Sequence, residues 1–463
     1  MTILPYDGAA VETLDGFRRG LYACMTRRAD ALFETAEAVL CAPGRVQDVA
    51  RLSLAGECRR GHGGLYDGLA CGRIDADRLR GLLAQAPLPG FPGGRIVLGV
   101  DVSNWPRPEA ARSPGRCFCH TYARGKGQAQ MIPGWPFSFV AALGAGPDSW
   151  TGVLDVERVP PGGDATLLTA AQLRGVVGRL GAAGHRAGQD PPVLVVADAG
   201  YDLTRLSWLL AGLPVTVCGR VRSDRVYRAA PEPAPPGPGR PRRHGARLAL
   251  ADPDAMPVPD WAAARDTARY GRVVVDAWLG THQMLERRGG WARHEGELPA
   301  VEGTLIRLRP QRLPGDRAPK PMWLWAGAEG GPDDIDAWWM AYLRRFDLEH
   351  TFRLFKQQLG WTRPMLRSPD AAARWTWLVV AAHTQLRLAR PLAADIRPPW
   401  QPRLPPERLT PARVRAGFPR IRATLTNPAR PPKPPHPGPG RPPGSTNRAR
   451  APVQPVGKPR QQG

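Results

Sequence analysis

Residues 94–103 read GRIVLGVDVS, a short apolar run that reaches Asp101. A run of this length is typical of a buried β-strand. A second run of the same kind, PVLVVADAGYD at residues 192–202, reaches Asp198 at the end of its apolar part. If the two strands are parallel neighbours, their carboxyl ends lie at one edge of a sheet, which is where open α/β sheets bind ligands. The sequence therefore predicts that Asp101 and Asp198 face each other at this edge.

Each aspartate also has a simpler interpretation as a helix cap or a turn residue, and the Ala-Gly after Asp198 favours a turn. Two apolar strands that both end in aspartate favour the shared site over two independent caps. Asp155, Glu157 and Asp202 are alternative acids, but none combines the strand-end position and the order of elements as well. The expected order is strand, strand, strand, helix, strand, helix, strand, over residues 94–103, 116–126 with 130–144, 149–159, 166–185, 192–198, 203–213 and 214–223.

A third acid lies in residues 342–356, YLRRFDLEHTFRLFK, within a single helix that we expect over about residues 334–359. Leucine and phenylalanine fill much of one side of this helix. The other side carries one carboxylate together with two cations and a phenol, either as a solvated ion pair or as a metal ligand among phosphate-binding groups. At about 100° per residue, four side chains fall within about 60° of one another on this side: Tyr342, Arg345, Glu349 and Lys356.

The spacing of these four residues resembles the Y-R-E-K signature of DDE transposases from bacterial cut-and-paste insertion sequences. The predicted strand order is similar to that of the ribonuclease H-like fold which these enzymes use. In that family a β-rich insertion separates the second aspartate from the glutamate helix, as residues 222–330 would here. The resemblance covers roughly residues 94–390. It implies a catalytic and metal-binding triad of Asp101, Asp198 and Glu349, with Tyr342, Arg345 and Lys356 contacting DNA.

The resemblance also implies the chemistry. Hard Mg²⁺ ions prefer oxygen ligands, and two ions about 3.5–4 Å apart can activate an attacking oxygen and stabilise a leaving one. We therefore expect two Mg²⁺ ions, with Mn²⁺ able to substitute, and no Ser, Cys or His nucleophile. The expected function is cleavage and strand transfer at terminal inverted repeats, by a homodimer in a synaptic complex with target DNA. Two alternatives are a domesticated or inactive DNA-binding relative and a ribonuclease H-like DNA nuclease without strand transfer.

The expected fold class is α/β, with a ribonuclease H-like catalytic core in two parts, residues 93–221 and 331–395. A β-rich insertion, residues 222–330, interrupts the core. Residues 1–92 are predicted to form a helical N-terminal domain, either for binding DNA ends or as a helical cap on the core. Residues 396–463 form a Pro- and Arg-rich tail that we expect to be largely disordered, because its final part carries no acidic residue and few apolar ones.

The charge balance favours a polyanionic partner. The chain carries 64 Lys and Arg against 41 Asp and Glu, a formal net charge of +23. Such an excess indicates nucleic acid, although GC-rich coding can also raise the arginine content. Two segments with a G-R-P core, residues 237–245 and 438–444, resemble hooks that bind the DNA minor groove, and the alternative is a solvated linker.

Several other classes are disfavoured. No stretch approaches the roughly 20 apolar residues that span a bilayer, and the start lacks the pattern of a secretory signal. Seven scattered cysteines suit a reducing cytoplasm, so we expect a cytoplasmic, nucleoid-associated protein without a membrane partner. Cys117, Cys119 and His120 resemble metal ligands, but no second Cys/His pair completes a zinc site. For Trp323 and Trp325 we expect packing in the core rather than stacking on a DNA base.

Overall fold

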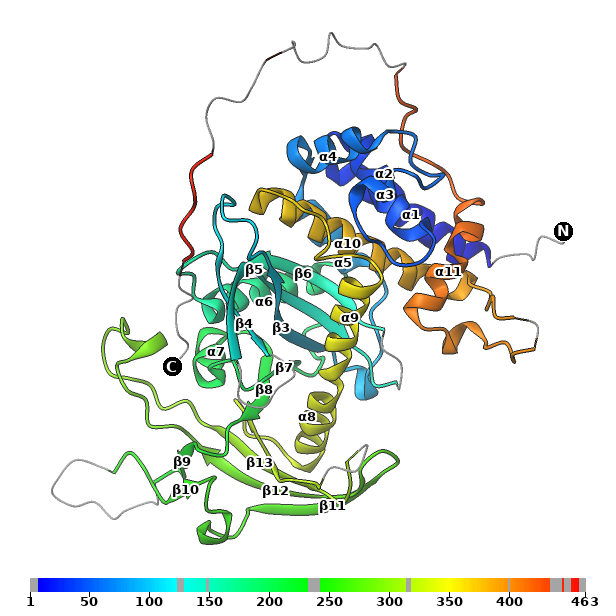
Figure 1. The fold of residues 1–463 in the computed structure, drawn as a ribbon. Helices are drawn as coiled ribbons and strands as arrows, with labels where there is room; N and C mark the ends of the chain where they lie inside the picture. The colour runs from blue at the N-terminus through cyan, green and yellow to red at the C-terminus, as the bar shows by residue number, and fades with distance from the viewer. Residues whose placement is uncertain are drawn as a thin grey trace.

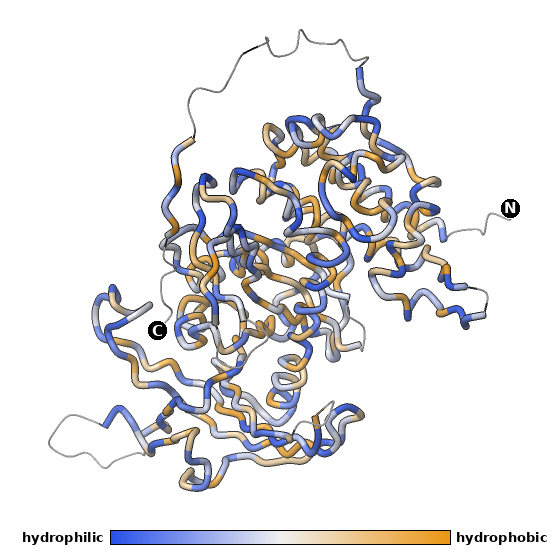
Figure 2. The backbone as a smooth tube through the Cα atoms, in the orientation of Figure 1, coloured by the Kyte–Doolittle hydropathy of each residue, from blue (hydrophilic) through white to orange (hydrophobic). Residues whose placement is uncertain are grey.

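In the computed structural model, the described residues are 7–122, 129–146, 150–231, 242–313, 318–398, 400–433, 444 and 451–457. They form a mixed α/β fold built around one large sheet, with helices packed against it. Figure 1 shows the N-terminal helices beside α10 and α11 at one end of the molecule and strands β9 to β13 at the other, with α8 and α9 between them. Hydrophobic segments run through the central strands and through the helices around α10 (Figure 2).

The centre of the sheet has the predicted order of elements. β3 pairs with β5 in an antiparallel manner and with β7 in a parallel manner, and β7 is parallel to β8. All five residues of β7 are buried, as expected of a parallel strand covered on both faces. The elements are β3 (Val97–Pro106), β4 (Cys117–Tyr122), β5 (Ala129–Leu143), β6 (Gly152–Arg158), α6 (Ala165–Ala182), β7 (Val193–Ala197), α7 (Leu203–Leu209) and β8 (Val215–Val221).

The strand that contains Asp101 does not end there. β3 continues to Pro106 because β5 pairs with it along its whole length, whereas β7 on its other side ends at Ala197. Gly99 pairs with Val196, so two residues further along each strand Asp101 is level with Asp198. The prediction that this strand ends at Asp101 is therefore wrong. The two acids nevertheless lie close together, as expected, at the point where β7 ends.

Residues after β8 extend the same sheet. β14 pairs with β8 in an antiparallel manner, and β13, β12 and β11 follow in order. Trp323 and Trp325 are buried in the core, as expected. The division of the chain into domains stays a prediction. The strands added to the large sheet are β11 (Trp261–Thr267), β12 (Gly271–Thr281), β13 (Gly303–Pro310) and β14 (Met322–Ala326), while β9 (Val226–Arg228) and β10 (Arg247–Ala249) form a separate two-stranded sheet.

The helix predicted over residues 334–359 is two helices. α8 (Pro332–Arg344) and α9 (Phe346–Gln357) meet at Arg345. The N–H of Arg345 bonds to the carbonyl of Tyr342, three residues back, so the chain tightens at this point instead of continuing the i to i−4 pattern. The prediction that Tyr342 shares one helix with Arg345, Glu349 and Lys356 is therefore wrong, because Tyr342 belongs to α8.

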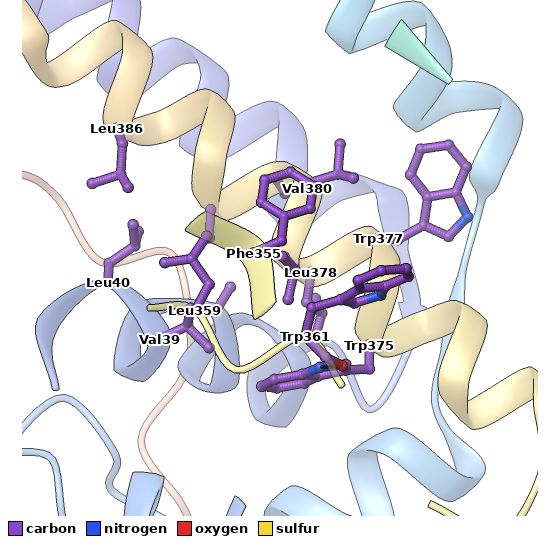
Figure 3. Close-up of a cluster of buried hydrophobic side chains, with 14 of the residues drawn as sticks. Val39, Leu40, Phe355, Leu359, Trp361, Trp375, Trp377, Leu378, Val380 and Leu386 are labelled. Carbon is purple, nitrogen blue, oxygen red and sulfur yellow. Dashed lines mark hydrogen bonds between the residues drawn. The ribbon is translucent and has the colours of Figure 1, made fainter. Parts of the chain in front are cut away.

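A helical bundle adjoins the sheet and shares its core with α9. Figure 3 shows Val39 and Leu40 of the N-terminal helices close to Phe355 of α9 and to side chains of α10. Trp361, just after α9, is fully buried and donates from Nε1 to Thr376 Oγ1 at 2.9 Å. The bundle consists of α1 (Gly8–Cys24), α2 (Ala29–Cys41), α3 (Val49–Leu52), α4 (His62–Cys71), α5 (Ala76–Gln85), α10 (Pro369–Ala389) and α11 (Pro411–Arg422), with the short strands β1 (Met25–Arg27) and β2 (Arg73–Ile74).

The tail differs from the expectation of disorder over its first part. α11 packs into the bundle because Val414, Phe418 and Ile421 recur at helical spacing and are buried. Further on, Gly457 pairs with the start of β4: its N–H donates to the carbonyl of Arg116 at 2.9 Å, and its carbonyl accepts from the N–H of Phe118 at 3.1 Å.

The G-R-P segments fall largely outside the described residues. Among the helices that the structure describes, none is long and apolar enough to cross a membrane.

Candidate active site

Asp101 lies at the centre of the candidate site, on β3. Its Oδ1 accepts from the N–H of Val102 at 2.8 Å, and its Oδ2 accepts from Nη1 of Arg345 at 3.2 Å. Burial and the neighbouring charge of Asp198 raise the pKa of Asp101 to about 7, and Glu349 acts in the same direction. The charge of Arg345 and the Val102 bond oppose this rise. Asp198 and Glu349 are thus both close enough for their charges to act on Asp101.

Asp198 follows the end of β7 directly. Its Oδ1 accepts from the N–H of Gly200 at 2.9 Å, so the turn interpretation is correct for one of its oxygens. A Cβ on Gly200 would lie 3.0 Å from that oxygen, so the turn is tight at this point. The turn uses one oxygen of the carboxylate, which leaves the other for a role in the site.

Glu349 belongs to the first turn of α9 and is partly exposed. Its Oε1 accepts from Nη2 of Arg345 at 2.9 Å. The guanidinium of Arg345 therefore lies between two carboxylates, those of Asp101 and Glu349. Burial lowers the pKa of Arg345, but the charges of Asp101, Tyr342, Asp198 and Glu349 raise it above its usual value.

Tyr342 and Lys356 complete the group predicted from the sequence. Tyr342 is only 7% exposed, and burial raises the pKa of its hydroxyl. Lys356 is partly buried, with its ammonium 5.6 Å from the ring centre of Trp361. Burial lowers the pKa of Lys356, whereas the charge of Asp101 raises it. The structure thus brings Arg345 and Lys356 close to Asp101. Tyr342 is more buried than expected of a residue that contacts DNA.

The alternative acids have structural partners. Asp155 is 2% exposed and pairs with Arg80 at 2.8 Å and with Arg179 at 3.1 Å. Asp202 caps α7 by accepting from the N–H of Arg205 at 2.9 Å. The third alternative, Glu157, is 3.6 Å from Arg80.

A metal ion would have to displace an existing contact. Over the described part of the chain, no group of three or more His, Cys, Asp or Glu side chains is arranged to hold a metal ion. Cys117, Cys119 and His120 are among the described residues, and they form no such group either. Asp101 and Glu349 share the guanidinium of Arg345 instead. The chemistry of the donor set still fits a hard divalent cation, because carboxylate oxygens are its preferred ligands and two of these acids already hold a cation between them.

A pocket lined by arginines adjoins the site and was missed by the sequence analysis. It has a volume of about 160 Å³ and lies between the turn after Asp198, the end of β8 and residues 283–291. Arg220, Arg222 and Arg225 line it and are exposed, and no hydrogen bond or ion pair joins their side chains to another described residue. The signal that would have revealed them is the spacing R-x-R-x-x-R where a parallel strand ends.

The same pocket has an aromatic wall. Trp291 lines it, and the ring of Trp291 lies 5.5 Å from that of Trp208. Trp291 is only 5% exposed, so it shapes the wall of the pocket, and the arginines are the groups available to a nucleic acid backbone.

Comparison with known proteins agrees with this geometry. Residues 20–286, more than half of the chain, match the family described as DDE superfamily endonuclease, and the chain belongs to this family. The matched region contains Asp101 and Asp198 and ends before Glu349. No curated protein matches the chain. Membership supports a transposase-like DNA nuclease, with DNA as its substrate and divalent metal ions, which DDE nucleases generally use.

Proposed function

We propose that this protein is a DDE transposase of the Y-R-E-K subgroup, encoded by a bacterial insertion sequence. It binds the terminal inverted repeats of its element, cuts them and joins the free ends to target DNA. Asp101, Asp198 and Glu349 are its catalytic residues and metal ligands. The observation that carries the proposal is the position of Asp101, level with Asp198 across the sheet and joined to Glu349 through Arg345.

The fold supports this proposal at a second level. The strands β6, β5, β3, β7 and β8 are neighbours in this order, with β3, β7 and β8 parallel and β5 antiparallel to β3. This order supports the proposal that the core is ribonuclease H-like. The arrangement accounts for the first two acids, because parallel neighbours align their carboxyl ends, and the third acid arrives on a helix that packs nearby.

The residues of the chain have separate tasks in this mechanism. Divalent ions, Mg²⁺ or Mn²⁺, would supply activation of the attacking oxygen and stabilisation of the leaving oxygen. Oxygens of Asp101, Asp198 and Glu349 would hold them, and Asp101 must be deprotonated to do so. Lys356 and Arg345 neutralise phosphates beside the reacting one, and Tyr342 donates a hydrogen bond to the same backbone.

The wider setting follows from this chemistry. Two element ends must be held together before they are joined to a target, so a homodimer in a synaptic complex is the working form. A net charge of +23 suits an extended DNA surface, and such a protein would act in the cytoplasm at the nucleoid.

Neutralising each acid in turn tests the proposal. Asp101→Asn, Asp198→Asn and Glu349→Gln should each reduce metal-dependent cleavage of element-end DNA about a thousandfold, since about 4 kcal/mol of transition-state stabilisation depends on each ligand. Binding of the same DNA should change little. Asp333→Asn, an exposed acid at the start of α8, is the control and should cut like the wild type. Undiminished cutting by any of the three variants would reject this assignment.

The products of the wild-type reaction separate the alternatives. Joined products with a supplied target duplex identify a transposase. Cuts without joining indicate a nuclease without strand transfer. Binding without cuts in either Mg²⁺ or Mn²⁺ indicates an inactive DNA-binding relative.

A further inference from the structure

Arg345 occupies a special place in the chain. It is the residue between α8 and α9, and its guanidinium reaches across to β3. One nitrogen donates to Asp101 Oδ2 at 3.2 Å and another donates to Glu349 Oε1 at 2.9 Å. Its side chain is 13% exposed, so these contacts are largely shielded from solvent. The two proposed metal ligands are therefore joined by a cation that belongs to the protein.

Charge explains why a cation is present there. Asp101, Asp198 and Glu349 bring three carboxylates together, and their mutual repulsion in a partly buried site is costly. A guanidinium is planar and can bridge two carboxylates, which an ammonium does less well. Lys356 also acts on Asp101, but no ion pair with a described carboxylate holds it. Arg345 is thus the neutralising group that a metal ion would have to replace.

DNA offers Arg345 another partner. A phosphate binds a guanidinium through two parallel hydrogen bonds, as a carboxylate does. Arg220 lies close enough to Tyr342 for its charge to oppose the rise in the pKa of Tyr342 that burial causes. Tyr342 in turn lies beside Arg345. A DNA backbone drawn to Arg220 and to the adjoining arginine pocket would therefore pass next to the guanidinium of Arg345.

From this geometry we propose that Arg345 couples DNA binding to metal binding. Without DNA, Arg345 neutralises Asp101 and Glu349 and lowers the affinity of the site for a divalent ion. A phosphate of bound DNA takes over the guanidinium, which releases both carboxylates to the metal. Arg345 is a positioning residue in this scheme. The inference rests on the proposed function, because it takes Asp101 and Glu349 as metal ligands.

The position of Arg345 in the chain suits this exchange. At the junction of α8 and α9 its N–H is bonded three residues back, and the N–H of Leu348 bonds to its carbonyl in the same way. A tightened turn of this kind is a frequent site of local rearrangement within helices. A small rotation about this junction would move the guanidinium away from Glu349 without disturbing Phe355, which is fixed in the shared core.

Linkage makes the proposal measurable. If DNA raises the affinity for metal by some factor, metal must raise the affinity for DNA by the same factor. The measurement uses the full chain and Mn²⁺, with the free ion followed by electron paramagnetic resonance, first without DNA. Arg345→Met keeps an unbranched side chain but removes the charged guanidinium. This variant should bind Mn²⁺ about tenfold more tightly than the wild type, and added duplex should then increase its affinity little.

Two further variants serve as controls for the Mn²⁺-binding measurement. Arg353→Met alters an exposed arginine of the same helix α9 and should leave Mn²⁺ binding unchanged. Arg345→Lys keeps the charge but cannot bridge both acids, so its Mn²⁺ affinity should fall between those of the wild type and Arg345→Met. It also serves if Arg345→Met does not fold. Equal or weaker Mn²⁺ binding by the Arg345 variants without DNA would overturn the coupling.

Glu349→Gln separates the two proposals. Unchanged Mn²⁺ binding by Glu349→Gln would mean that the metal site, and with it the proposed function, is wrong. Abolished Mn²⁺ binding by Glu349→Gln together with no gain in Arg345→Met would reject the coupling alone.

Discussion

Asp101 and Asp198 come from neighbouring parallel strands and lie level with each other where β7 ends. Burial and the charge of Asp198 raise the pKa of Asp101 to about 7, so the site is under electrostatic strain near neutral pH. A folded protein that brings acids together in this way gives up some stability, which is common at functional sites.

The first prediction concerns pH. The pKa of Asp101 in the folded state, about 7, lies above the model-compound value of 3.8, so the folded protein holds this proton over a range where the unfolded chain has released it. The free energy of unfolding should therefore fall as pH rises from about 4 to about 7, by at most about 4 kcal/mol for this group.

Asp101→Asn removes this dependence. Denaturant unfolding without metal measures the free energy of unfolding of Asp101→Asn and of the wild type. The variant should exceed the wild type by more at pH 8 than at pH 5. Asp333→Asn is the control, because that acid is exposed. The same difference between Asp101→Asn and the wild type at both pH values would contradict the prediction.

A second prediction concerns the arginine pocket. Changing Arg220, Arg222 and Arg225 together to Gln should weaken DNA binding and make its dependence on salt concentration shallower. The logarithmic slope should decrease by about 0.9 for each phosphate that the protein no longer neutralises, hence by nearly three. Fluorescence anisotropy at several salt concentrations measures the slope. Arg408→Gln, an exposed arginine near α11, is the control. An unchanged slope in the triple variant would show that the pocket does not bind DNA.

A third prediction concerns the shared core. Trp361 is fully buried, and its ring lies 5.8 Å from that of Phe137 in the sheet. Trp361→Ala should lower the free energy of unfolding by about 3–5 kcal/mol. It should also reduce DNA cleavage, because the ammonium of Lys356 lies over the same ring. Trp400→Ala removes a tryptophan that is 81% exposed and should change neither. A Trp361→Ala variant as stable as Trp400→Ala would contradict the packing described here.

A fourth prediction compares two truncations. Removal of residues 434–463 should lower the free energy of unfolding by about 1–3 kcal/mol, because it deletes the backbone hydrogen bonds that Gln454 and Gly457 make beside β4. Removal of residues 428–463 should cost about 1–3 kcal/mol more, because it also deletes hydrogen bonds within the bundle. Among these are the bonds from Arg59 Nη2 to the Ala429 carbonyl, from Arg60 Nη2 to the Arg430 carbonyl, and from the Arg430 N–H to Asp30 Oδ1. Thermal unfolding of both proteins measures the difference, and equal melting temperatures would show that residues 428–433 contribute nothing.

Local patterns predicted the central strands and the proximity of Asp101 to Asp198. The apolar runs before Asp101 and Asp198 are strands, and they are parallel neighbours, the arrangement in which the two acids were expected to meet. The packing of Trp323 and Trp325 in the core was also expected and is confirmed. These predictions succeeded because burial on both faces of a strand leaves a plain signature in the residues themselves.

Predictions failed where contacts between distant segments decide the outcome. No proline or glycine marks the helix break at Arg345 in the sequence. At this break the side chain of Arg345 contacts Asp101, which is distant in the chain. The folded part of the tail was missed because α11 gains its stability from packing against the bundle, not from its own composition.

The order of residues along the chain is enough to define the central strands, the two aspartates beside their apolar runs and the basic character of the protein. Periodicity and charge are local properties, and they survive in any conformation of the chain. The distances between Asp101, Arg345 and Glu349, and the arginine pocket beside Asp198, depend on how the sheet and the helices pack. Packing joins residues that are hundreds of positions apart, and no local pattern encodes which of them will meet.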